Sequence, residues 1–325
     1  MLVLPNRGYL PILARLALFM LAVALLAGPA VAKNKPVALR VLSYNIHGLP
    51  ALIAKDDPEG RIPIITRKAG EYDVVLFQED FSHNALVDAN ASHGIIVRGN
   101  GPSGTANIKG VAVPISTVTG LMSGFGVSKE IADLAATAAK AAQPFGSGLT
   151  ALVRRGTAEV IDQQREAFGI CEGYKAAAQD CFAEKGVLMV RLRLSAGVEV
   201  DVYNTHLDAG EGARDQSIRV RQLGAITAFM KRHSQNRAVI FGGDFNMDWK
   251  NRTQRAAFER FLKSNGLTRL ATNQDGRHID HILVRSARSV HLTVRQAAVA
   301  PGFDKDGTPL SDHPPLFLDV QLVRR

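Results

Sequence analysis

The stretch Ala238–Asp248, AVIFGGDFNMD, decides the fold expected for this chain. A short apolar run of this kind is typical of a strand that is buried on both faces of a sheet. The two glycines predict a tight turn after the strand, with Asp244 and Asn246 projecting towards the same side. The alternative interpretation is an Asp/Asn turn at the start of a helix.

Other short polar motifs stand at the ends of strand-like runs elsewhere in the chain. They are SYNIHG with Asn45, FQED with Glu79, YNTHLD with His206, and LSDH with Asp312 and His313, while IDHILV carries Asp280 inside such a run. Amide, carboxylate and imidazole side chains delivered from strand ends suit a divalent-metal site that cleaves a phosphate ester. Each motif alone predicts little, whereas all of them in this order indicate such a site.

The chemistry of phosphodiester hydrolysis gives several of these side chains a role. The anionic oxygens repel a nucleophile, so catalysis needs a cation, a base for water, and donors for the developing charge. Asn45 and Glu79 are oxygen ligands suited to Mg²⁺, although Glu79 taken alone would be an ordinary surface acid. Asp244 is suited to orient and deprotonate water, and Asn246 can donate to a phosphate oxygen.

Two histidines complete the candidate site. His206 ends the run VDVYNT, and His313 precedes Pro314-Pro315, which hold that segment extended. An imidazole held by a carboxylate can bind a phosphate or move a proton, and Asp280 is the candidate partner of His313. His281 lies on the opposite face of its strand and is expected to pack in the core.

The remaining pattern indicates one α/β domain over residues 33–325. A helix is expected over Arg214–Lys231, and a second one around Phe258 and Phe261 ends at Asn265-Gly266. Strands are expected at Val37–Tyr44, Asp73–Gln78, Val111–Ser116, Leu149–Val153, Val187–Leu194, Val198–Asn204, Ala238–Phe241, Ile279–Val284 and Leu316–Leu322.

Residues 1–32 resemble a secretory signal peptide. Arg7 and Arg15 precede an uncharged apolar run, and Ala30-Val31-Ala32 is a cleavage site, so export to the periplasm or the medium is expected. An uncleaved anchor is the alternative. The chain has 39 Lys and Arg against 30 Asp and Glu, so losing the two arginines leaves a net charge of +7. Such a charge favours nucleic acid, anionic lipid or phosphorylated substrates.

Two further segments carry expectations. Residues 99–148 are rich in small residues, with a mostly alanine helix expected at Ile131–Ala142, and are interpreted as an irregular insertion. A loop that contacts a membrane or caps the substrate is the alternative. Cys171 and Cys181 are the only cysteines and are expected to pair in an oxidising compartment, the alternative being two free thiols.

With these motifs, the chain resembles the endonuclease/exonuclease/phosphatase superfamily, which includes deoxyribonuclease I, abasic-site endonucleases, inositol-polyphosphate phosphatases and neutral sphingomyelinases. The resemblance spans the mature chain and implies a four-layer α/β sandwich with Mg²⁺-dependent attack by water, Mn²⁺ or Ca²⁺ being other possible ions. It implies these positions: Asn45 and Glu79 at the metal with Asp312 near it, His206 and Asn246 at the phosphate, Asp244 at the water, and Asp280 paired with His313.

Within the superfamily, YNTHLDAGEG and DCFAEKGVL are similar to the sphingomyelinase branch. There, an Asp and a Lys at the spacing of Asp180 and Lys185 precede a strand, and the Lys lies near the substrate phosphate. The resemblance therefore implies a phospholipid substrate and contact with a membrane surface, with no obligate protein partner. The rivals are a secreted nuclease, a catalytically dead binding module, and, for Lys185, a solvated loop position.

Overall fold

The computed structural model describes residues 35–49, 56–101, 105–108, 111–114, 146–172, 180–270 and 278–325. The expected signal peptide and the expected helix at Ile131–Ala142 lie outside these residues. Two short paired strands, β4 (Thr105–Ile108) and β5 (Val111–Pro114), lie within the predicted insertion. Among the described helices, none combines the length and the apolarity needed to cross a membrane.

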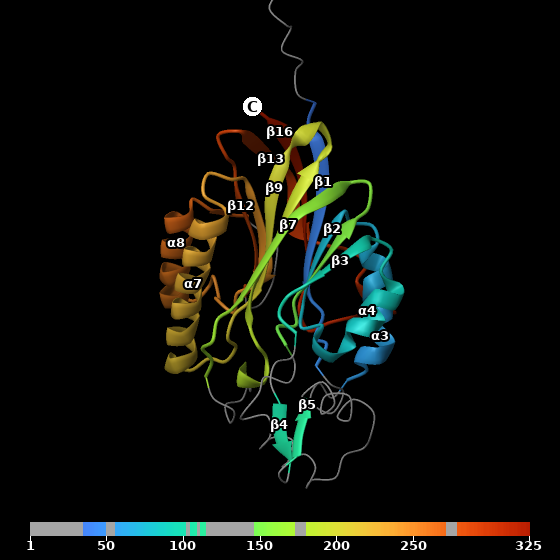
Figure 1. Cartoon of the computed structure of the whole chain (residues 1–325), viewed down its shortest axis with the longest axis vertical. Coiled ribbons are helices and arrows are strands. Elements are labelled where there is room, and N and C mark those ends of the chain that lie inside the picture. The colour runs from blue at the N-terminus through green and yellow to red at the C-terminus, as the bar shows by residue number, and fades with distance from the viewer. Residues whose placement is uncertain are drawn as a thin grey trace, which may run out of the picture. The chain divides into compact units, whose positions relative to one another are not determined.

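The first sheet has six strands in the order β13-β16-β1-β2-β6-β3 (Figure 1). Only β1 and β2 run parallel, so their carboxyl ends meet at the same edge of the sheet, where Asn45 pairs with Gln78. The strands are β1 Val37–Asn45, β2 Val74–Gln78, β3 Gly94–Arg98, β6 Thr150–Arg154, β13 Val290–Val299 and β16 Leu316–Arg324.

The second sheet also has six strands, in the order β11-β12-β10-β9-β8-β7. Its one parallel pair, β9 and β10, brings His206 opposite Asp244, and antiparallel β12 places Asp280 opposite Asp244 from the other side. The strands are β7 Ala158–Ala167, β8 Gly186–Leu194, β9 Glu199–His206, β10 Val239–Asp244, β11 Thr268–Arg269 and β12 Asp280–Arg285.

The two sheets pack face to face and helices cover their outer faces (Figure 1). Helices α3 (Pro58–Ala69) and α4 (Asn84–Asn90) cover the first sheet, while α7 (Ala213–His233) and α8 (Arg252–Asn265) cover the second. The expected four-layer sandwich is confirmed. Its remaining elements are η1 Phe81–His83, η2 Asp180–Phe182, η3 Ser195–Gly197, β14 Asp304–Lys305 and β15 Thr308–Pro309.

The core between the sheets is built from side chains at alternate strand positions. Val41 and Leu76 from the first sheet meet Val190, Val202 and Ile240 from the second, and all five are almost fully buried. Burying one such side chain stabilises the fold by roughly 1.5–3 kcal/mol. The sheets are therefore held at a fixed separation, which sets the distance between the polar residues at their ends.

The two glycines of the opening stretch have a different role from the predicted one. Gly242 and Gly243 lie inside β10, not in a turn after it. A Cβ atom on Gly242 would lie 2.8 Å from the side chain of Ser43, and one on Gly243 would lie 2.4 Å from the carbonyl oxygen of Thr205. The prediction of a tight turn is wrong, because the glycines permit close packing against neighbouring backbone and the facing sheet.

Candidate active site

The site lies at the carboxyl ends of the two parallel strand pairs. Asn45 ends β1, Glu79 follows β2, and His206 and Asp244 end β9 and β10. Asn45 joins the two sheets, because its amide nitrogen donates to Glu79 Oε1 at 2.9 Å and to Asp244 Oδ2 at 3.1 Å. These four polar side chains converge here only because the two sheets face each other.

Asp244 occupies the centre of this group. Its Oδ1 accepts a hydrogen bond of 2.9 Å from the backbone nitrogen of Asn246, and its Oδ2 lies 3.5 Å from His206 Nε2. The Asn246 side chain donates to the carbonyl oxygen of Leu207 at 3.1 Å. Asn246 and Glu79 have φ angles of 47° and 59°, a left-handed backbone that a residue with a Cβ rarely adopts. The packed strand ends hold the backbone of both residues in this conformation.

His313 and Asp280 form the expected pair, with 2.9 Å between Nδ1 and Oδ2. The other ring nitrogen, Nε2, lies 3.9 Å from Asp244 Oδ2. Burial lowers the pKa of His313, but the Asp280 and Asp244 carboxylates outweigh it and raise the pKa well above its ordinary value. Burial raises the pKa of Asp280 to about 6. The His313 imidazole is therefore protonated. Its partner Asp280 and His206 lie on opposite sides of Asp244 in the strand register.

Lys185 is a buried member of the site, only 7% exposed. Its ammonium donates to His206 Nε2 at 3.1 Å and to the carbonyl oxygen of Leu207 at 2.8 Å, and it pairs with Asp180. Burial and the nearby Lys185 charge lower the pKa of His206 well below its ordinary value, so this imidazole is neutral. The alternative of a solvated lysine is wrong.

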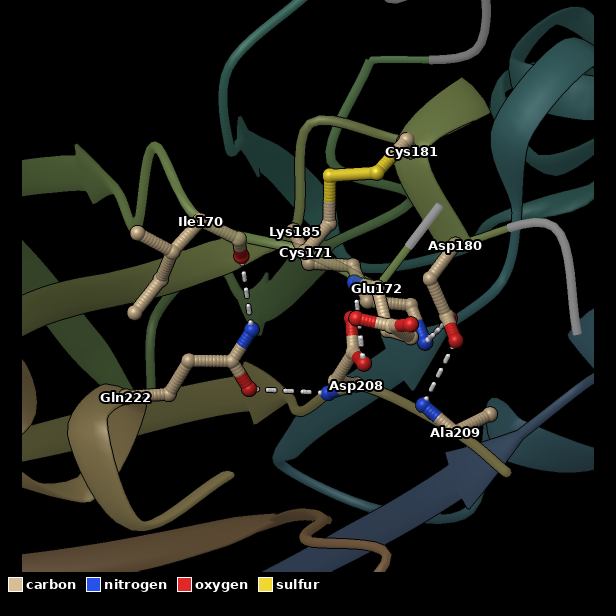
Figure 2. Close-up of a disulfide and its surroundings, with 9 residues drawn as sticks. All are labelled: Ile170, Cys171, Glu172, Asp180, Cys181, Lys185, Asp208, Ala209 and Gln222. Carbon is tan, nitrogen blue, oxygen red and sulfur yellow. Dashed lines mark hydrogen bonds and ion pairs between the residues drawn. A yellow bond between two sulfur atoms is a disulfide. The ribbon is translucent and has the colours of Figure 1, made fainter. Parts of the chain in front are cut away.

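Cys171 and Cys181 form a disulfide, as expected, with their Cα atoms 5.3 Å apart (Figure 2). The bond joins the two arms of the long connection between β7 and β8. Asp180, next to Cys181, is buried, and its second carboxylate oxygen accepts a hydrogen bond of 2.9 Å from the backbone of Ala209. Asp180 thus holds Lys185 and the segment after His206 together, so its carboxylate faces these protein groups.

The donors around Glu79 fit a hard divalent cation. Glu79 Oε2 is buried and has no hydrogen-bond partner, and burial raises the pKa of this carboxyl group. A cation beside Oε2 would provide the missing partner and offset the desolvation of the carboxylate. Glu79 Oε2 and the amide oxygen of Asn45 are both ligands that suit Mg²⁺. The side chain of Asp312 is 59% exposed and reaches the site through His47, whose Nδ1 lies 3.4 Å from Asp312 and 3.8 Å from Glu79.

Three residues at the site were not predicted from the sequence. His47 lies inside SYNIHG, two residues beyond Asn45 at the end of β1, and was identifiable there as a further polar side chain. Ser311 donates to the carbonyl oxygen of Asn45 at 2.8 Å, which ties the His313 segment to β1. Arg61 of α3 donates to the carbonyl oxygens of Ile46, His47 and Leu310. Its one carboxylate partner is Asp56, at 2.8 Å. A distant arginine whose contacts with the site are all to backbone oxygens leaves no signal in a motif.

The Endonuclease/Exonuclease/phosphatase family matches residues 42–313, so the chain belongs to this family. It is similar to the Sphingomyelinase of Mycobacterium bovis, with 29% identity over 199 residues. That match covers 55% of this chain and 38% of the relative, so the chain spans well under half of the relative's length.

Two solved structures share the fold at low sequence identity. The beta toxin of Staphylococcus aureus, in a doubly substituted form with bound magnesium ions, is 16% identical with a TM-score of 0.59, and the match covers 89% of this chain and 100% of that one. TDP2 of D. rerio, complexed with a single strand DNA product, is 15% identical with a TM-score of 0.58, and the match covers 87% and 98%. These likenesses establish the fold and leave the substrate open.

Proposed function

We propose that the protein is an exported, divalent-metal-dependent phosphodiesterase that hydrolyses a phospholipid of the sphingomyelin type. The carrying observation is the convergence of Glu79, Asp244, His206 and the His313–Asp280 pair at one edge of the sandwich. A bound Mg²⁺, Mn²⁺ or Ca²⁺ would be held by Glu79 and Asn45, with Asp312 nearby, and would polarise the phosphate oxygens.

The remaining catalytic steps are assigned to the protein side chains. Asp244 accepts a proton from the attacking water, whose oxygen forms the new bond to phosphorus. His313 gives its proton to the oxygen that leaves with the alcohol, and Asp280 stabilises the charged imidazole before that transfer. The amide of Asn246 and the neutral His206 contact the phosphate, and Lys185 supplies positive charge where negative charge develops. One ester bond and one water are consumed, and an alcohol and a phosphate monoester are released.

The buried pair of Lys185 and Asp180 favours a phospholipid substrate, together with the similarity to a mycobacterial sphingomyelinase. A secreted nuclease is the second candidate. It is supported by the net charge of +7 on residues 33–325 and by a fold shared with a DNA-bound structure. A basic protein gains affinity for DNA through many distributed phosphate contacts, whereas one buried lysine acts at a single phosphate.

A parallel assay on sphingomyelin, other phospholipids and plasmid DNA tests this function. We expect phosphocholine release from sphingomyelin, loss of turnover with EDTA, and recovery with Mg²⁺. Lys185→Ala should lower kcat on sphingomyelin more than it raises KM, because its charge acts in the transition state. Lys250→Ala, an exposed lysine, is the matched control and should keep the wild-type kcat.

The outcomes separate the candidates. DNA cleavage without phosphocholine release would replace the lipid substrate with nucleic acid. Full activity after exhaustive chelation would overturn the metal requirement, and no turnover on any substrate with metal present would favour a binding module.

A further inference from the structure

The outer sides of α7 and α8 form a surface that we call the basic face. Its exposed charged residues are Arg214, Arg221, Lys231, Arg232, Arg252, Arg255, Arg260 and Lys263, with Glu259 as the single exposed acid of these two helices. The helices lie side by side on the second sheet (Figure 1). Since both follow a strand that ends at the site, they run in the same direction and begin at the active-site end.

This face accounts for the whole charge excess of the mature chain. The two helices contain nine Lys and Arg residues against two acids, an excess of seven, which equals the net charge of residues 33–325. The other parts of residues 33–325 contain equal numbers of basic and acidic residues. The opposite helical layer, α3 and α4, contains three cations and two acids. The basic character is therefore a property of one face of the sandwich.

Helix stability does not explain this distribution. Lys231, Arg232 and Lys263 lie in last turns, where a cation stabilises the helix dipole. Arg214 and Arg252 lie in first turns, where the same dipole disfavours a cation. Within the described residues, Arg214 reaches Glu172 only at 3.5 Å, and Arg221 and Arg260 have no acidic partner. Arg252 therefore costs helix stability and, within the described residues, gains no ion pair, whereas Arg214, Arg232 and Arg255 each pair with a glutamate.

We propose that the basic face binds a membrane surface rich in anionic lipids. Clusters of four to eight Lys and Arg on an amphipathic helix have the charge that attracts such a surface. Val220 is 47% exposed between these cations, so an apolar side chain is available to the lipid interface. This inference rests on the proposed phospholipid substrate, because docking here would keep the active-site end beside the membrane that supplies it.

Binding to sphingomyelin-free vesicles tests this inference without turnover. Phosphatidylcholine vesicles with and without phosphatidylglycerol are sedimented with the full chain across a salt series. We expect binding only to the anionic vesicles, weakening as salt rises. The triple variant Arg221→Glu/Arg260→Glu/Lys263→Glu should bind more than about 100-fold more weakly. One basic residue near an anionic surface contributes about 1 kcal/mol, or roughly fivefold, and the new carboxylates add repulsion.

A matched control carries the same charge change elsewhere. Arg67→Glu/Arg288→Glu/Lys305→Glu alters three exposed cations outside the basic face and should bind like wild type. Circular dichroism checks the fold, and glutamine at the same face positions should give a smaller loss. Equal binding by the face variant and the control would overturn the proposal. The proposal would also be overturned if wild-type protein bound vesicles equally well with and without phosphatidylglycerol, or if the basic face bound duplex DNA more tightly than vesicles.

Micellar sphingomyelin separates this result from the proposed function. The basic face lies outside the site, so the face variant should hydrolyse uncharged micelles at the wild-type rate. If no protein hydrolyses the micelles while vesicle binding behaves as expected, the substrate is wrong and the docking surface stands.

Discussion

At the scale of single residues, two histidines near β12 contrast: His313 lies outside the strand and pairs with Asp280, whereas His281 belongs to the strand. His313 faces Asp244 in the site, whereas His281 packs against Phe258 with ring centroids 4.7 Å apart. His313→Ala should lower kcat by roughly 10²-fold or more with a small change in melting temperature, since it removes proton transfer. Asp244→Asn should lower kcat similarly.

His281→Ala is the matched comparison, because it should melt early and keep most of its turnover once folded. Activity assays below the melting temperature, with calorimetry of each variant, check both residues. A His313→Ala protein that melts early and turns over normally would assign this residue to structure.

His281 also predicts how stability depends on pH. It donates to the carbonyl oxygen of Met247 at 2.9 Å and accepts from Arg269 at 3.0 Å, and burial lowers its pKa to about 3. In the unfolded chain this imidazole takes up a proton as the pH falls below about 6.5, whereas in the folded chain it stays neutral down to about pH 3. The free energy of unfolding therefore decreases as the pH is lowered from about 6.5 to about 3. Arg269 and His278 are the other basic groups that act on it.

This residue should contribute a loss of stability on the order of 1 kcal/mol between pH 7.5 and 5.5. Urea unfolding of wild type and His281→Gln at both pH values measures it, and the variant should lose less stability over that interval. Identical losses in the two proteins would show that another group dominates acid sensitivity.

The connection between β7 and β8 carries a prediction at the scale of one element. Its disulfide closes a ten-residue separation and should stabilise the fold by about 2–3 kcal/mol. Non-reducing peptide mass spectrometry of the purified protein should show the two cysteine peptides linked. Cys171→Ser/Cys181→Ser should lower the free energy of unfolding by that amount, and reduced wild type should match it. Two alkylatable thiols in oxidised protein would contradict the bond.

Elements that contain buried apolar runs could be predicted from the sequence, and others could not. The apolar run AVIF lies at the start of β10. The predicted helix end at Asn265-Gly266 is the end of α8, where Gly266 has a φ of 62°. Strand β7, AEVIDQQREA, lies at a sheet edge with mostly polar residues, so its sequence lacks an apolar alternation. Helix α3 has prolines at positions 58 and 63, which favour a break instead of a helix.

At the scale of the whole molecule, the site depends on the contact between the sheets. Residues such as Glu79 and Asp244 were identifiable because polar groups at strand ends have a chemical meaning. The supporting role of Arg61 depends on packing between distant segments, which no local pattern records. Asp180 was identifiable from its spacing to Lys185, but its bond to the backbone of Ala209 was not. The same limit applies to Gly242, whose role follows from the approach of Ser43 on the facing strand.

Because the site is divided between the two sheets, it is complete only after both sheets have formed and packed together. Asn45 and Glu79 come from one sheet, while His206 and Asp244 come from the other. A nascent or partly unfolded chain with one sheet formed carries only half of the groups that act on a phosphate ester. Under the proposed function, hydrolytic activity therefore begins only when the two sheets have packed against each other.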